Sequence, residues 1–263
     1  MKAAIMLPVG ATLAITLVGC GAGQPSSQPS ATAPVGTTRP ASTTTPKAAP
    51  DLATANESVF ADQMAASISN IPATVVSGEL MQAYVRFENA YSAAWGAVGQ
   101  PDSSATVTQV PDGFTLCYTG SSGSTCERLT DFTTNQAGQI TELLVDNQAV
   151  AGRVAVGPAA TSDGLTISDV VALRFAGAPN LVGVAFKLTD TSYRPVNENP
   201  ALLASLGGAS PGIEDSALPA TLAPGDSLYA GAAFDITQVT GLFCLQPNDG
   251  FGEQLPCTTL RKI

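Results

Sequence analysis

The chain has 263 residues, with eleven basic and twenty-one acidic side chains, a net charge of −10 and no histidine. The lack of histidine excludes Ser-His and Cys-His nucleophile pairs, histidine general bases and most catalytic zinc sites. A chain this acidic, without a basic cluster, is a poor candidate for binding nucleic acid or anionic lipid, so we expect no nucleic-acid partner.

The first 19 residues have the pattern of an export signal. Met1-Lys2 supplies positive charge, and residues 3–18 are apolar but too short for a comfortable transmembrane helix. The run Leu17-Val18-Gly19-Cys20 resembles the lipobox of bacterial lipoproteins. The resemblance implies cleavage before Cys20, a thiol that carries diacylglycerol, and often an amino group acylated with a fatty acid such as palmitate. The alternative is an ordinary secretory leader followed by a chance cysteine.

The lipid anchor sets the expected location. Each buried methylene contributes about 0.8 kcal/mol, so two or more acyl chains hold a protein on a membrane essentially without release. We therefore expect a lipoprotein on the outer face of the cytoplasmic membrane, in the cell envelope. The alanine-rich, lysine-poor composition is typical of a GC-rich genome, such as that of an actinobacterium.

Residues 20–50 have the composition of a disordered tether. After Cys20 they contain six prolines, six threonines, four serines and six alanines, and Val35 is the only large apolar residue. Such a segment cannot bury enough apolar surface to offset the entropy lost on ordering. The run Thr43-Thr44-Thr45-Pro46 is either a site for sugars or part of a bare linker.

Residues 51–156 predict an α+β domain that begins with two helices. Apolar residues recur every four positions from Phe60 to Ile68, and Pro72 stops the run. Ser77 is placed to cap a second, stronger helix. Its apolar stripe steps by three and four residues through Leu80, Tyr84, Phe87, Tyr91 and Trp95.

The aromatic stripe on the second helix has two interpretations. Tyr84, Tyr91 and Trp95 are candidates to line a cavity for a small apolar ligand. More often such a stripe is the face of a helix that packs on a sheet. The sequence leaves both open, with the packing interpretation favoured.

After the second helix the period of the pattern changes to two, which is typical of strands. Turn residues separate the runs into two hairpins, so we expect an antiparallel meander. The expected strands are 106–110, 114–118, 128–133 and 140–145.

Four cysteines besides Cys20 form two local pairs. Cys117 lies nine residues before Cys126, and Cys244 lies thirteen before Cys257. Local pairing is favoured because more than a hundred residues separate the pairs, and it implies an oxidising compartment. The spacing is not the Cys-x-x-Cys of zinc or thioredoxin-type sites. We therefore expect two disulfides and no metal.

Residues 157–263 predict an all-β domain. Alternating apolar residues in 171–175 and 184–188 indicate half-buried strands, and 228–236 is another strand. A long loop, 197–219, contains a possible helical turn at 200–206. A last hairpin joins strands 239–246 and 254–260, and the intervals between strands are typical of a small antiparallel β-sandwich.

One motif in this second half combines a Pro-Gly turn with a Phe-Asp pair in the following strand. Leu222-Ala223-Pro224-Gly225-Asp226-Ser227, then Gly231 and Phe234-Asp235-Ile236, preceded by Phe186-Lys187-Leu188, resembles the immunoglobulin-like domains of secreted mycobacterial antigens and Gram-positive lipoproteins. The resemblance implies an immunoglobulin-like sandwich and brings no catalytic residue. Pro224-Gly225 makes a tight turn into a strand, from which Phe234 points inward and Asp235 outward.

No motif for catalysis or cofactor binding is present. The chain lacks the Gly-x-Ser-x-Gly elbow, a phosphate-binding glycine loop and a dinucleotide fingerprint. A carboxylate pair drawn from Asp131, Glu142, Glu214 and Asp215 is disfavoured because these residues are expected to be solvated. A calcium site formed by Glu198, Glu214, Asp215 and Asp226 is also disfavoured, because the sequence lacks the alternating Asp-x-Asp loop of calcium-binding proteins.

The expected protein is thus a lipid-anchored, non-catalytic protein-interaction module with no cofactor. Its fold is an α+β domain followed by an immunoglobulin-like sandwich, and its partner is an unidentified envelope protein. The alternative is a carrier or sensor of a small apolar ligand held beside Trp95. A carboxylate-based hydrolase is the third and weakest hypothesis.

Overall fold

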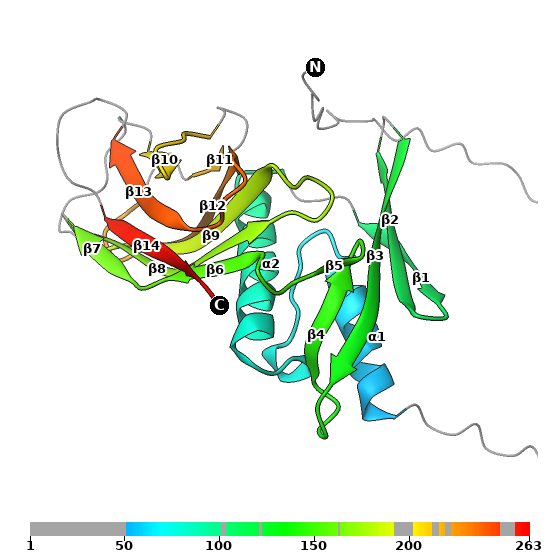
Figure 1. Cartoon of the computed structure of the whole chain (residues 1–263). Helices are drawn as coiled ribbons and strands as arrows, with labels where there is room; N and C mark the ends of the chain where they lie inside the picture. The colour runs from blue at the N-terminus through cyan, green and yellow to red at the C-terminus, as the bar shows by residue number, and fades with distance from the viewer. Residues whose placement is uncertain are drawn as a thin grey trace, which may run out of the picture. The chain divides into compact units, whose positions relative to one another are not determined.

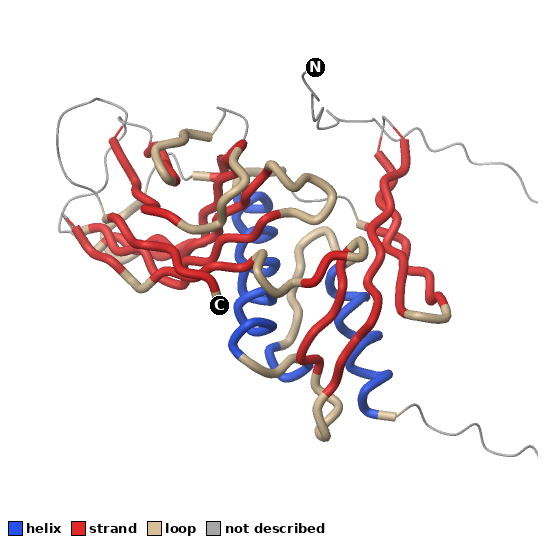
Figure 2. Tube along the Cα trace, in the orientation of Figure 1, coloured by secondary structure: helices blue, strands red, loops and turns tan. Residues whose placement is uncertain are grey.

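The computed structural model describes residues 51–100, 104–120, 123–162, 164–191, 202–211, 216–218, 222–247 and 256–263 (Figure 1). The expected leader, Cys20 and the tether lie outside these ranges. Contacts unite Pro50–Ile263 into one compact unit. This unit is mostly β-structure, with antiparallel sheets and two α-helices among its described residues (Figure 2).

The first half of the chain forms both helices and a five-stranded sheet. The helices are α1 (Leu52–Met64) and α2 (Glu79–Ala97), with a short 3₁₀ turn, η1 (Ala73–Val75), between them. The sheet has the order β1 (Ala105–Val110), β2 (Gly113–Gly120), β3 (Gly123–Thr134), β4 (Ile140–Val145) and β5 (Gln148–Ala149). All of its neighbouring strands are antiparallel, as the predicted meander requires.

The second half forms a nine-stranded sheet. Its order is β10 (Leu202–Leu206), β13 (Gly241–Pro247), β14 (Cys257–Lys262), β6 (Val154–Gly157), β8 (Leu165–Arg174), β9 (Leu181–Asp190), β12 (Ser227–Asp235) and β11 (Ser216–Ala217), with β7 (Ala160–Ser162) beside β8. The boundary expected between residues 156 and 157 therefore falls inside β6, which pairs with β8 and β14.

The structure corrects the end of the first helix and the start of the second. Asp51 starts α1 by accepting a hydrogen bond from the Thr54 amide at 2.8 Å, and the helix ends before Ile68, which is 48% exposed. Ser77 is not the N-cap of α2, because Gly78 holds that position and no side chain caps the helix. The Ser77 amide donates to the Ile140 carbonyl at 2.8 Å. The chain is thereby held against β4, and the helix starts one residue later, after Gly78.

The nine-stranded sheet curls around its own apolar core. Phe243 in β13 contacts Phe186 in β9 and Phe234 in β12, with ring centroids 5.2 and 6.4 Å apart. Three strands separate β13 from β9 in the sheet order, so these rings meet only because the sheet bends into a near-barrel (Figure 1). The core inside it includes Ile167, Phe186, Leu188, Leu206, Phe234 and Phe243.

A second core lies outside this sheet, where α1 and α2 pack. Helix α2 contacts β8, β9 and β12 of the nine-stranded sheet and β4 of the five-stranded sheet. The core includes Phe60, Met81, Tyr84, Phe87, Leu116, Leu129, Ile140, Val171 and Leu173. Residues of both halves of the chain therefore share one apolar layer around α2.

The expected half-burial of the two strands over 171–175 and 184–188 holds at Arg174 and Lys187, which are partly exposed, but fails in the middle of each strand. Val170–Leu173 and Val182–Phe186 are buried at every described position. Alternate side chains of each strand point into the sheet's own core, and the remaining ones lie under α2. Covering by a helix removes the exposed face that alternation predicts.

The segment expected to form a helical turn, 200–206, is instead a strand where it is described. β10 pairs antiparallel with β13 from Leu202–Pro247 to Leu206–Phe243. The interpretations of the Pro224-Gly225 turn and its strand agree with the structure: the Asp226 amide donates to the Ala223 carbonyl, Phe234 is fully buried and Asp235 is exposed.

Both predicted disulfides are confirmed. Cys117 faces Cys126 across β2 and β3, and Cys244 faces Cys257 across β13 and β14. Each pair joins directly opposite residues of neighbouring strands, with Cα atoms 4.1 Å apart. One disulfide therefore fastens each sheet.

Helix α2 lies on β9 closely enough to require glycine at residue 183. A Cβ at Gly183 would lie 2.8 Å from ring carbons of both Phe87 and Phe175. We expect Gly183→Ala to lower the free energy of unfolding by roughly 1–3 kcal/mol, because these rings cannot both move aside in a packed core. Gly177→Ala is the matched control, since the nearest atom to its added Cβ is 3.9 Å away. Urea unfolding measures the effect, and equal midpoints for the two variants would contradict it.

Candidate functional site

A buried arginine joins the two sheets. Arg153, just before β6, is 3% exposed. Its Nε donates to the Arg174 carbonyl at 2.8 Å, at the end of β8, and its Nη1 donates to the Gln148 carbonyl at 3.3 Å, in β5. Since a buried guanidinium keeps its charge, it needs these partners and nearby negative charge.

That negative charge comes from the helix and from β3. Glu88 lies one turn after Tyr84 on α2, and Glu127 lies on β3; both carboxylates interact electrostatically with Arg153. Burial raises the pKa of Tyr84 well above its usual range, helped by the charges of Glu88 and Glu127 and by a hydrogen bond to Glu88. Burial also lowers the pKa of Arg153, and the three acidic groups oppose that shift.

Glu127 is the group in this cluster that titrates near neutral pH. Burial, with repulsion from Asp146, raises its pKa to about 7, and attraction to Arg153 limits the rise. A carboxyl group with such a pKa can exchange a proton at physiological pH. Its attraction to Arg153 offsets only part of the cost of burying it, so the charged form of Glu127 is held at a net cost.

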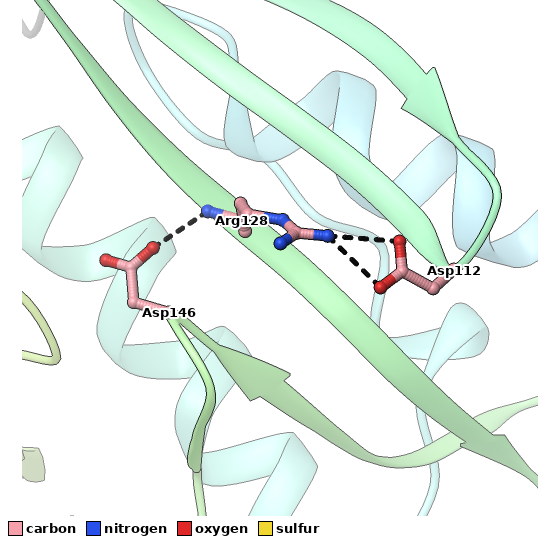
Figure 3. Close-up of polar contacts among 3 residues, drawn as sticks. All are labelled: Asp112, Arg128 and Asp146. Carbon is pink, nitrogen blue, oxygen red and sulfur yellow. Dashed lines mark hydrogen bonds and ion pairs between the residues drawn. The ribbon is translucent and has the colours of Figure 1, made fainter.

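The nearby polar contacts of Arg128 are on the surface (Figure 3). Its amide donates to Asp146 Oδ1 at 2.9 Å, and its Nη2 lies 3.1 Å from both carboxylate oxygens of Asp112. The side chains of Arg128 and Asp112 are 46% and 53% exposed. Solvent screening makes such a pair worth little, about 0–1 kcal/mol.

A different set of side chains lines a groove on the outer face of the nine-stranded sheet. The groove has a volume of about 650 Å³ and is bordered by α2, β6, β8 and β14. Its polar lining consists of Arg86, Ser168, Asp169, Thr259 and Arg261, and its floor includes Val156 and the segment 157–159.

Local irregularities of the strands shape this groove. The register of β8 with β9 shifts between Ser168 and Val171, a β-bulge in which Asp169 has a φ of 52°. On β14 the even-numbered Thr258 and Leu260 are buried, so Thr259 and Arg261 point outward. At Gly157 a Cβ would lie 2.8 Å from Thr258, so glycine lets β6 end close to β14.

The electrostatics of the groove differ from those of the rest of the protein. Residues 51–263 contain eight basic and twenty-one acidic residues, yet Arg86 and Arg261 line the same groove. Both are exposed, and neither forms an ion pair with any described residue. Lys187, opposite Ser168 in the register, adds a third cation to this face.

The predicted ligand-lining residues lie together on α2. Tyr91 stacks on Phe87, with centroids 5.0 Å apart, and meets Trp95 and Phe175 edge-on at 6.0 and 5.8 Å. Tyr84 is 1% exposed and belongs to the charged cluster. The rings thus contact one another and the sheet, while the groove involves other residues.

The acidic residues weighed for catalysis or calcium are not brought to the groove where they are described. Asp131 and Glu142 lie on β3 and β4 of the other sheet, and Asp226 lies in the turn before β12. Glu198, Glu214 and Asp215 lie outside the described residues.

Sequence reasoning missed both the groove and the charged cluster. No spacing rule joins Arg86 with Arg261 or Glu127 with Arg153, because these pairs come from elements far apart in the chain that meet only through tertiary packing. The sequence held one indication of these sites: basic residues are few, so the role of each arginine calls for an explanation.

The raised pKa of Glu127 predicts a specific pH dependence of stability. Between its ordinary value of 4.5 and about 7, the folded protein keeps a proton that the unfolded chain has lost, so this residue's contribution to stability falls as pH rises. We expect Glu127→Gln to be more stable than wild type at pH 8 by on the order of 2 kcal/mol, and equally stable at pH 4. Urea unfolding at both pH values measures this. The control is Glu142→Gln, and a Glu127→Gln variant with the wild-type pH dependence would refute the assignment.

In the described part of the chain, neither helix is long and apolar enough to cross a membrane. Within the same residues, no group of three or more histidine, cysteine, aspartate or glutamate side chains is placed to hold a metal ion. Comparisons with models of protein families, with curated proteins and with solved structures find no match.

Proposed function

We propose that the protein is a lipid-anchored, non-catalytic interaction module of the cell envelope. The groove beside α2 is its binding surface and receives a negatively charged group of the partner. The observation that carries this proposal is the pair of exposed arginines, Arg86 and Arg261, in one groove of an otherwise acidic protein, without an ion pair to any described residue. Cations left free in a concave site favour an anionic ligand.

Support for the location comes from two parts of the chain. The run ending in Cys20 has the pattern of a lipobox, and the tether after it separates the folded part from the lipid surface. The two disulfides require an oxidising compartment. Both features fit the outer face of the cytoplasmic membrane.

The fold proposed for the second half is an immunoglobulin-like sandwich. The contacts of Phe186, Phe234 and Phe243 inside the curled sheet support it, as does the Pro224-Gly225 turn. The two helices with the five-stranded sheet would then be an α+β layer added to it. Such sandwiches commonly bind through loops and exposed faces rather than catalyse reactions.

The groove lacks the contacts that activate a nucleophile. Ser168 and Thr259 line it, but neither hydroxyl makes a hydrogen bond to another described residue. A nucleophilic serine or threonine needs a base within about 2.6–3.2 Å. The lining groups are therefore better suited to holding a ligand than to cleaving one.

The anchor is tested by Cys20→Ala. We expect this variant to move from the membrane fraction to the soluble extracytoplasmic fraction, because no thiol remains at the lipobox to carry diacylglycerol. Ser27→Ala, in the same segment, is the control and should stay with membranes. The measurement is immunoblotting of fractionated cells, and continued tight membrane association of Cys20→Ala would overturn the anchor.

The binding surface is tested by photo-crosslinking in intact cells. A photoreactive residue replacing Thr259 should give a higher-mass product, because Thr259 lines the groove; the same residue replacing the exposed Thr108 on β1 is the control. Adding Arg86→Glu and Arg261→Glu should remove the Thr259 product. A product that survives this charge reversal, or no product at all, would count against the groove as the binding surface.

A further inference from the structure

We propose that the ligand of the groove is an acidic sugar, such as a uronic acid unit of an oligosaccharide. This inference rests on the proposed function, since it names the chemistry of the ligand that the groove binds. The groove combines cations, a carboxylate and two hydroxyls that have no ion pair or hydrogen bond among the described residues, a combination that matches a hydroxylated acid.

The two arginines of the groove are suited to bind the acid group of the ligand. Arg86 projects from α2 and Arg261 from β14, so cations approach the groove from two different elements. Guanidinium groups bind carboxylates through paired N–H donors, with geometry that a lysine cannot reproduce. Two such groups in one groove can hold a single carboxylate or two successive acidic units.

Asp169 favours a sugar acid over a simple oxyanion as the ligand. Its carboxylate lines the same groove and has neither an ion pair nor a hydrogen bond among the described residues. It would repel a free phosphate held by the arginines, but it accepts hydrogen bonds from the hydroxyls of a sugar ring. The left-handed backbone at its bulge, with a φ of 52°, is the kind of local irregularity that re-aims a side chain at a binding site.

Further hydroxyl and ring groups continue across the same face. Ser168 and Thr259 supply hydroxyls in the groove, and each can both donate and accept. In the strand register, Ser168 lies opposite Lys187, and Lys187 lies opposite Tyr229, which is 42% exposed. The face therefore offers an aromatic ring two strands from the groove, where it can cover the apolar side of a further sugar unit.

The size of the groove suits this ligand. A volume of about 650 Å³ lies within the range of about 300–1,000 Å³ that small-molecule sites occupy. It exceeds what a single inorganic anion fills, so most of the groove would be left to the hydroxylated part of the ligand.

The test is calorimetric titration of the full-length protein in neutral detergent with trigalacturonic acid, maltotriose and inorganic phosphate. We expect trigalacturonic acid to bind at least tenfold more tightly than either of the others, because only it offers both an acid group and ring hydroxyls. Arg86→Gln with Arg261→Gln should weaken it at least tenfold. Asp169→Asn should weaken trigalacturonic acid severalfold and strengthen phosphate. Arg128→Gln, whose guanidinium lies on the five-stranded sheet, is the matched control and should change none of these affinities.

The outcomes distinguish this inference from the proposed function. Binding of phosphate as tight as that of trigalacturonic acid, or tighter binding of both after Asp169→Asn, would make the groove a general anion site and overturn the sugar acid. No binding of trigalacturonic acid, together with a Thr259 crosslink that depends on the arginines, would also overturn the sugar acid but leave the binding function standing. Loss of both the binding and the crosslink would overturn both.

Discussion

The packing of α2 against β9 is the contact on which the rest of the structure depends. At Gly183 the rings of Phe87 and Phe175 lie against the strand backbone, and this close approach buries the outer side of β8 and β9. With that side covered, the strands need apolar residues on both faces, and the sheet's remaining exposed outer surface lies beside the helix. The groove occupies that surface, so Arg86 on α2 faces residues of β14 because of the same contact.

The buried charges around Arg153 connect the two sheets near α2. The guanidinium binds carbonyls of β5 and of the end of β8, and so links the five-stranded sheet to the nine-stranded one. A buried ion cluster contributes less to stability than to specificity, because much of its attraction offsets the cost of desolvation. Here its hydrogen bonds specify how the two sheets meet. The arginines of the groove differ, since they remain exposed to solvent.

Local patterns in the sequence predicted local structure well. The meander of β1 to β4, the strand β12 and the two cysteine pairs follow from alternation, turn residues and spacing within about twenty residues. Errors arose where a distant segment decides the outcome. Residues 202–206 form a strand because β13 pairs with them, and α2 begins after Gly78, one residue beyond the Ser77 amide that binds the Ile140 carbonyl of β4. The residues that line the groove could not be predicted from the sequence for the same reason, since Arg86 and Arg261 are 175 positions apart.

The place of β14 in the sheet has a consequence for how the protein matures. This strand, Cys257–Lys262, is the last described one in the chain, yet it lies inside the sheet between β13 and β6. Until it arrives, both neighbours present unpaired edges and the apolar core around Phe243 stays open to water. Under the proposed export from the N-terminus, the sheet can close only after residues 257–262 have crossed the membrane. Under that proposal, export interrupted before this point would leave an aggregation-prone intermediate, and the Cys244–Cys257 bond could form only after Cys257 has crossed.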